Sequence, residues 1–205
     1  NWAQENANAI IDAWYPGEMG GKAFAQLIFG DYSPSGRLPV TFYKTSDELP
    51  AFDDYSMKGR TYRYMENEPL YPFGYGLSYT DFVYSSITAD CTHLNETETV
   101  NIKFEVKNAG AFDGYEKIQI YVSPLSPSVI TPLWELKYFK AVYLKKGEKS
   151  IVSIDLPLNA FTLVDENGNR FVERGAFRIY AGGSQPGQRS EELTGKTVNF
   201  TDIII

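Results

Sequence analysis

The spacing of hydrophobic residues changes along the chain. Up to residue 42, apolar side chains recur at helical intervals, whereas beyond residue 80 they alternate with polar residues or form short apolar runs. The first pattern predicts helices and the second predicts strands. Residues 44–70, between them, are polar and follow neither period. The pattern therefore predicts a short helical part, a long loop and an all-β part.

Two helices and one strand are predicted in the helical part. The first helix begins near Glu5 and ends at Tyr15, before Pro16 and Gly17. Its apolar stripe is Ala7, Ile10, Ile11 and Trp14. The second helix ends at Gly30 and has the stripe Ala23, Phe24, Leu27 and Ile28. Residues 38–42 then predict an edge strand, because Pro39 cannot donate a hydrogen bond to a sheet.

So few elements cannot bury their apolar faces by themselves. We therefore expect an apolar face on residues 1–42 that another part of the protein covers. The chain also opens at Asn1, already inside a helical pattern, and we interpret this as the start of a fragment.

The all-β part predicts about seven short strands separated by glycine-containing turns. This number of strands in about 120 residues is typical of an immunoglobulin-like or fibronectin type III-like sandwich. Six of these strands are assigned, at residues 83–89, 100–106, 118–122, 136–144, 151–156 and 177–180. The fold class is thus an α+β fragment, a partial α/β sandwich of two helices and an edge strand, followed by an all-β domain. We place the two domains at residues 1–80 and 81–205.

The junction at residues 72–80 (PFGYGLSYT) combines paired glycines with aromatic residues. Gly74 and Gly76 allow backbone angles that are closed to other residues, and the rings supply apolar area. A flexible linker would lack the aromatic bulk. We therefore predict an ordered hinge that packs the two parts rigidly together.

Composition and charge exclude several classes of partner. The formal net charge is -7, so the chain has no electrostatic footprint for nucleic acid or for an anionic membrane. It contains no apolar run of membrane-spanning length. The single cysteine, Cys91, rules out an intrachain disulfide and a cysteine-rich zinc site, and it leaves the cellular compartment open. We predict no metal and no cofactor.

Residues 59–64 (GRTYRY) are the main candidate for a binding function. Long loops inside compact proteins are usually functional or disordered, and the interleaving of arginine and tyrosine argues against disorder. Arg60 and Arg63 would donate hydrogen bonds to carboxylates or sugar hydroxyls, while Tyr62 and Tyr64 pack. The alternative, which we favour slightly, is that ion pairs pin the loop to the rest of the protein.

Other candidate chemistry is sparse. The proximity of Cys91 and His93 suggests a nucleophile pair, but no third group that would orient the histidine is evident. Asn95 and Asn199 begin glycosylation triplets, which occur often by chance. Four pairs of acidic residues are close in sequence, but sequence neighbours do not face each other across a sugar, so we interpret them as solvated turn residues. These pairs are Asp53/Asp54, Glu66/Glu68, Asp165/Glu166 and Glu191/Glu192.

Three long blocks closely resemble the C-terminal part of family 3 glycoside hydrolases. They are residues 13–21 (AWYPGEMGG), 29–42 (FGDYSPSGRLPVTF) and 71–80 (YPFGYGLSYT), in the same order as in the family. Residues 114–122, 136–140 and 146–148 are similar to the fibronectin type III-like domain that ends many of these enzymes. The loop at 59–64 is similar to the β-xylosidase and arabinofuranosidase branch.

The resemblance implies a retaining, exo-acting enzyme that removes β-linked xylose or glucose from non-reducing ends. Its aspartate nucleophile would lie on an N-terminal barrel and its glutamate acid/base upstream in the α/β sandwich. No carboxylate of this chain matches either motif, so we predict no catalytic residue and an inactive isolated chain. The implied partners are the remainder of the enzyme and a β-linked oligosaccharide. Arg60, Tyr62, Arg63 and Tyr64 would line the rim of the active site.

Two other hypotheses stay open. The first is a carbohydrate-binding module, which requires a planar row of exposed aromatic residues on the sandwich. Tyr115, Tyr121, Tyr138 and Tyr143 would supply such a row, although their strand positions suit a core equally well. The second is a structural module that stabilises its neighbour and mediates formation of a homo-oligomer.

Overall fold

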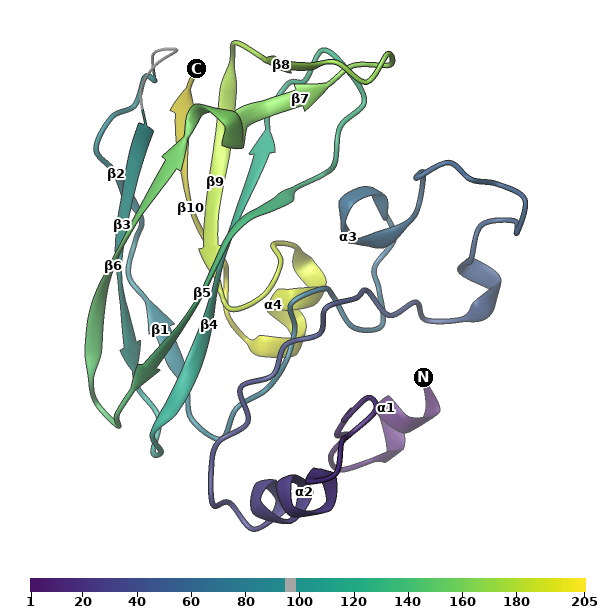
Figure 1. Cartoon of the computed structure of the whole chain (residues 1–205), viewed down its shortest axis with the longest axis vertical. Helices are drawn as coiled ribbons and strands as arrows, with labels where there is room; N and C mark the ends of the chain where they lie inside the picture. The colour runs from purple at the N-terminus through teal and green to yellow at the C-terminus, as the bar shows by residue number, and fades with distance from the viewer. Residues whose placement is uncertain (95–98) are drawn as a thin grey trace.

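The computed structural model describes residues 1–94 and 99–205 and contains a β-sandwich with a helical lobe beside one end (Figure 1). The lobe holds helix α1 (Trp2–Asn6) and helix α2 (Gly20–Ile28). A loop that projects from the body carries the 3-10 helix η1 (Ser46–Glu48) and the one-turn helix α3 (Thr61–Tyr64). The chain then enters the sandwich. Within the described residues, no helix is long and apolar enough to cross a membrane.

Two antiparallel sheets form the sandwich. The first sheet contains β1 (Phe82–Tyr84), β2 (Thr88–Ala89), β3 (Thr99–Asn108) and β6 (Lys149–Pro157), with β3 pairing to the other three. The second has the order β10-β9-β4-β5, built from β4 (Gly114–Pro124), β5 (Glu135–Leu144), β9 (Ala176–Gly182) and β10 (Asn199–Ile204). Helix η2 (Leu158–Phe161), the ribbon of β7 (Thr162–Val164) and β8 (Arg170–Val172), and helix α4 (Gln188–Thr194) complete the fold.

The core lies between the two sheets and follows the alternation of the strands. In β3, Val100, Ile102, Phe104 and Val106 point inward, and their neighbours in sequence point outward. From the second sheet, Ile118, Ile120 and Ile179 meet them. An antiparallel sheet with one buried and one solvated face produces this pattern. The predicted fold class, a small α+β part followed by a β-sandwich, is confirmed.

The sequence pattern missed three strands and merged two others. The predicted strand 83–89 is broken into β1 and β2, because the register against β3 shifts by one residue between Tyr84 and Thr88. The ribbon β7–β8 is too short to show an alternating pattern. Strand β10 pairs with β9 over its whole length, yet its polar outward residues conceal the buried Ile203. These strands are identified from the strands that they pair with, because their own sequences do not show a strand pattern.

The first predicted helix is wrong over most of its length. Only Trp2–Asn6 is helical, and the chain from Ala7 to Met19 is irregular. The apolar stripe that predicted the helix is exposed, with Ile10 50% and Trp14 52% accessible. Short helices gain most of their stability by packing an apolar face against other elements. Here the described residues leave much of that face exposed, although Trp14 lies near Phe42.

The rest of the lobe agrees better with the pattern. Helix α2 forms as predicted, and Gly30 takes the left-handed conformation (φ 79°) just after it. The predicted edge strand 38–42 is reduced to an isolated bridge between Phe42 and Tyr71. Before Pro39, backbone hydrogen bonds tie Leu38 to Tyr75 and to Gly74, and after it they tie Phe42 to Tyr71 and to Leu70. The missing amide hydrogen of the proline interrupts what would otherwise be a ladder.

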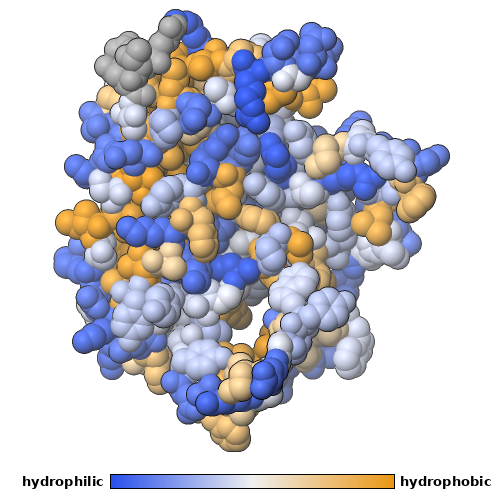
Figure 2. Space-filling model, in the orientation of Figure 1, coloured by the Kyte–Doolittle hydropathy of each residue, from blue (hydrophilic) through white to orange (hydrophobic). Residues whose placement is uncertain are grey.

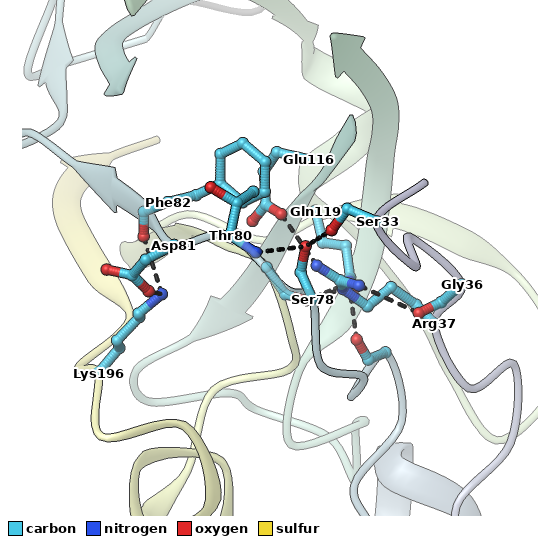
Figure 3. A network of polar contacts seen from close by, with 12 residues as sticks. Ser33, Gly36, Arg37, Ser78, Thr80, Asp81, Phe82, Glu116, Gln119 and Lys196 are labelled. Carbon is cyan, nitrogen blue, oxygen red and sulfur yellow. Dashed lines mark hydrogen bonds and ion pairs between the residues drawn. The ribbon is translucent and has the colours of Figure 1, made fainter. Parts of the chain in front are cut away.

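A buried ion pair joins the helical part to the sandwich (Figure 3). The Arg37 guanidinium lies 2.9 Å from the Glu116 carboxylate, and the two side chains are only 9% and 4% exposed. Arg37 also donates to the carbonyl of Gly183 at 3.2 Å, and Tyr84 donates to the other Glu116 oxygen at 2.7 Å. The charges are thus paired and hydrogen-bonded on both sides, as burial of an ion pair requires.

The glycine-rich hinge packs on the outer face of the second sheet. The side chain of Gln119 donates to the carbonyls of Gly74 (3.0 Å) and Gly183 (2.8 Å), and it accepts from Tyr121 (2.6 Å). Gly74 has φ 76°, and a side chain on it would meet the carboxamide of Gln119. At Gly76 a side chain would strike the carbonyl of Gly36. The predicted rigid hinge is therefore present, and its glycines are required by close approach.

Replacing Gly74 tests the tightness of this packing. Gly74→Ala adds a methyl group that overlaps Gln119, whereas Gly147→Ala places the same residue at the same φ (77°) in open space. The left-handed strain of about 1–2 kcal/mol is common to both variants. We expect Gly74→Ala to lose about 2 kcal/mol more from the free energy of unfolding, measured by urea denaturation. Equal losses would contradict tight packing at the hinge.

Candidate functional site

The loop from residue 44 to 70 holds the predicted rim residues and is anchored at its base to the sandwich. Its outer part projects away from the body of the protein and carries apolar surface (Figures 1 and 2). Its inner part is the helix α3, which packs against the strand β5 and the hinge. The loop is therefore fixed at its inner end and displayed at its outer end.

Tyr62 is the main apolar anchor of α3. Its ring stacks on Phe73 at 4.4 Å between centroids and meets the edge of Tyr121 at 5.9 Å. Its hydroxyl accepts a hydrogen bond from the Leu136 amide at 3.2 Å. Burial raises the pKa of Tyr62, so the phenol stays neutral at physiological pH. Tyr62 is thus part of the packing between the loop and the second sheet.

Arg63 ties the same helix to the start of β5. Its guanidinium lies 3.1 Å from one oxygen of Glu135, whose other oxygen pairs with Lys137 at 2.8 Å. The carbonyl of Arg63 accepts a hydrogen bond from the Leu133 amide at 2.6 Å. The sequence-based alternative, that ion pairs pin the loop, is confirmed for this residue.

Arg60 shapes the outer part of the loop. Its guanidinium donates to the carbonyls of Asp54 and Ser56, which flank Tyr55. The Asp54 carboxylate accepts from the Ser56 amide at 2.8 Å, and hydrogen bonds from Ser56 hold the pKa of Asp54 below its usual value. This arrangement directs Tyr55 outward, where it is 88% exposed, close in sequence to Phe52 at 98%.

The backbone between Arg60 and α3 is strained. Thr61 adopts a positive φ of 57°, which is rare for a β-branched residue. Its hydroxyl accepts a hydrogen bond from the Arg63 amide at 3.3 Å, and the carbonyl of Tyr64 accepts one from Gly59 at 3.2 Å. Strain of this kind is often found where a loop must hold a functional geometry.

The four predicted residues therefore have different surroundings. Tyr62 and Arg63 face the sandwich, Arg60 holds the turn at 54–56, and Tyr64 lies beneath the guanidinium of Arg63 at 5.9 Å. Sequence reasoning missed Phe52 and Tyr55, which are the most exposed rings of the loop. The sequence did carry a signal for these two residues. Large aromatic residues beside aspartates, in a segment without helical or strand periodicity, do not lie on the apolar face of an element, so they have no surface on which to be buried.

The acidic pairs have local structural contacts. Asp54 and Asp165 accept backbone hydrogen bonds in turns, and Glu192 contacts Arg189. Hydrogen bonds lower the pKa of all three, so none is a proton donor near neutral pH, where a general acid requires a raised pKa. Glu68 lies 3.6 Å from Lys44.

The remaining sequence candidates have structural contacts. Cys91 packs against the core, and His93 Nδ1 lies 3.1 Å from the Thr92 hydroxyl. The amide of Asn199 donates to the carbonyls of Tyr84 and Ser85 and so has a structural role, while Asn95 lies outside the described residues. Among the residues that the structure describes, no group of three His, Cys, Asp or Glu could hold a metal ion.

The predicted row of four tyrosines is wrong in two of its members. Tyr121 is fully buried beneath Tyr62, and Tyr138 is partly buried against the core. Tyr138 pairs with Ile120 in the regular register of β4 and β5, so it lies on the inner face of the sheet. Tyr115 and Tyr143 remain exposed and pair directly across β4 and β5.

Comparison with known proteins gives two family matches. Residues 1–79 match the glycosyl hydrolase family 3 C-terminal domain, and residues 116–185 match the fibronectin type III-like domain. A xylan 1,4-beta-xylosidase of Xylanibacter ruminicola is 38% identical over 191 residues, which are 93% of this chain and 22% of that protein. A periplasmic beta-glucosidase of Salmonella typhimurium is 35% identical, over 87% of this chain and 25% of that protein.

Solved structures resemble the whole chain. A β-glucosidase from Erythrobacter marinus superposes with a TM-score of 0.82 at 34% identity, covering 98% of this chain and 26% of its own. A beta-glucosidase from Kluyveromyces marxianus also has a TM-score of 0.82, at 31% identity, covering 99% of this chain and 25% of its own. The chain thus spans about a quarter of the length of the relatives that it matches.

Removing the Tyr62 ring tests the anchoring of the loop. Tyr62→Ala deletes the stack on Phe73, and we expect it to cost about 2–3 kcal/mol of stability and to speed tryptic cleavage after Lys58 and Arg60. Tyr55→Ala is the matched control, because that ring is exposed and its loss leaves the anchor intact. An unchanged cleavage rate in Tyr62→Ala would mean that something else holds the loop.

Proposed function

Because the chain belongs to glycosyl hydrolase family 3 and carries its C-terminal and fibronectin type III-like domains, we propose that it is the non-catalytic C-terminal part of a β-glycosidase. The enzyme removes β-linked xylose or glucose from the non-reducing ends of plant oligosaccharides. The chain contributes scaffold and part of the active-site rim. The nucleophile and the acid/base are on the remainder of the enzyme. The boundary between the two domains lies after residue 80 in this proposal.

The observation that carries this proposal is the exposed apolar face of the lobe. Trp2 and Ile28, which lie on helices, are 75% and 62% accessible, and Phe29, directly after α2, is 84% accessible. Ile11, in the irregular segment between the helices, is 44% accessible. Both helices stand away from the sandwich in Figure 1. Large exposed apolar surfaces usually mark a site that another part of the protein or a partner covers.

The proposed cover for this face is the region that the relatives have in addition to the part matched here. Those relatives are about four times as long as the matched part, so they include enough chain to complete the α/β layer. The face mixes aliphatic and aromatic residues, as the interior of a domain does. Its docking would also give the irregular segment after Ala7 a surface on which to fold into the helix that its pattern predicts.

We further propose that the loop 44–70 borders the active site of the assembled enzyme. Three features support this: its rigid base at Tyr62 and Arg63, the strained Thr61, and the exposed rings of Phe52 and Tyr55. Arg60 and Tyr64 complete the rim. Sugar rings pack well on exposed aromatic faces, and a rigid loop lowers the entropic cost of that contact.

Hydrolysis of 4-nitrophenyl β-xyloside and β-glucoside tests the proposal. The chain alone should release no 4-nitrophenol. After mixing with the separately expressed upstream region of the enzyme, the two should co-elute in size-exclusion chromatography and hydrolyse at least one substrate. The preferred substrate then assigns the sugar specificity.

Activity of the chain alone would overturn the proposal, because a carboxylate pair described above would have to be catalytic. A stable but inactive complex would contradict it as well. The double variant Ile11→Ser/Ile28→Ser is the matched control: it should abolish co-elution while the sandwich stays folded, since both side chains are exposed in the chain alone.

A further inference from the structure

A second exposed aromatic surface lies on the outer face of the sandwich, on the strands β4 and β5. Tyr115, Phe139 and Tyr143 are 48%, 55% and 46% accessible, and we call these three residues the outer aromatic patch. Tyr115 pairs directly with Tyr143, and Phe139 pairs with Gln119. Paired residues of an antiparallel sheet point to the same side, so all three rings share one face.

Two rings of the patch, Tyr115 and Tyr143, are held in place by their neighbours. Tyr115 and Tyr143 lie 5.0 Å apart between centroids at an angle of 57°. The Tyr143 hydroxyl donates to Asp113 at 3.1 Å, and this hydrogen bond raises the pKa of Tyr143. The Lys117 ammonium lies 5.5 Å from the centre of the Tyr115 ring. A ligand would therefore meet preorganised rings on a rigid sheet, at a low cost in side-chain entropy.

The composition of the patch distinguishes it from the lobe. Over the described residues of β4 and β5, Ala141 is the only exposed aliphatic side chain, and its small size leaves the rings standing above it. The apolar face of the lobe instead includes isoleucine and methionine. Aromatic rings rimmed by polar groups, without aliphatic bulk, suit the C–H faces of sugars better than a protein interior.

The shape and charge of the patch restrict the ligand further. Phe139 and Tyr143 are four residues apart on one strand, a separation of about 13 Å, so a ligand that contacts both must be elongated. The charged groups that contact the patch are Lys117, over the Tyr115 ring, and Asp113, bonded to Tyr143, one of each sign, so neither sign dominates. A neutral polysaccharide chain meets both conditions.

We propose that the outer aromatic patch is a non-catalytic binding site for a neutral β-linked polysaccharide. Phe139 and Tyr143 contact separate sugar rings of one extended chain, and Tyr115 supports Tyr143. The site keeps the enzyme on its polymeric substrate while the active site removes terminal residues. The identity of that polymer rests on the proposed function, but the binding itself requires only this chain.

Native affinity electrophoresis of the chain tests this inference, with soluble xylan in one gel and soluble mixed-linkage β-glucan in another. We expect at least one polysaccharide to retard the chain. The double variant Phe139→Ala/Tyr143→Ala should bind about tenfold more weakly or worse, because it loses both stacking surfaces. Tyr143→Phe retains the ring and should stay retarded. Tyr15→Ala, an exposed ring on the lobe, is the control and should behave as the unmodified chain.

Two results would overturn the inference. One is an unmodified chain that neither polysaccharide retards. The other is a double variant that remains fully retarded, which would place binding elsewhere. Circular dichroism of the double variant verifies its fold, and the low burial of both side chains predicts that it is native. The outcome is independent of the hydrolysis experiment, because no upstream region is present in the gel.

Discussion

The arrangement of this protein depends on one buried ion pair between Arg37 and Glu116. Removing two charges from water is costly, and the cost is offset here because Gly183 and Tyr84 satisfy further hydrogen-bonding groups of the pair. Gly183 must lack a side chain, since a Cβ atom would come within 2.5 Å of the Glu116 carboxylate. A buried pair of this kind adds little net stability compared with an apolar contact, but it tolerates few geometries. It therefore fixes how the helical part sits on the sandwich, and the glycine hinge and the Gln119 network follow from that placement.

With this orientation fixed, the chain presents three surfaces of different chemistry. The lobe displays aliphatic and aromatic residues together, as the half of an unfinished core would. The loop at 44–70 is anchored at α3 and displays two rings, Phe52 and Tyr55, on a turn that Arg60 holds. The outer aromatic patch displays rings on the outer face of a sheet, with Ala141 as their only exposed aliphatic neighbour on β4 and β5. The lobe suits contact with another protein domain, the loop suits a terminal sugar, and the outer aromatic patch suits a polymer chain. One small scaffold can therefore serve an enzyme in three ways.

Periodic features were predictable from the sequence, whereas features that depend on distant partners were not. The alternation in β3 and the stop of α2 at Gly30 are local, and the structure has both. The helix expected from Glu5 to Tyr15 needs a surface that the described residues do not provide, so its stripe stays exposed. Strand β10 and the burial of Tyr121 depend on β9 and on Tyr62, which are far away in sequence. In the candidate site, arginine and tyrosine were recognised as important, but only the contact with Glu135 reveals that Arg63 anchors the loop and does not face outward.

Hydrogen–deuterium exchange of the Arg37→Met variant tests the central role of the buried pair most directly. The amide of Phe73 donates to the side chain of Gln185 and the amide of Gln185 donates to the carbonyl of Phe73, so these two amides bond across the junction and report on docking. The amides of β3 report on the sandwich core. Unpairing Glu116 should loosen the junction. We predict that the Phe73 and Gln185 amides exchange at least about tenfold faster in the variant while β3 keeps its protection. Unchanged exchange at Phe73 and Gln185 would show that the ion pair does not hold the two parts together.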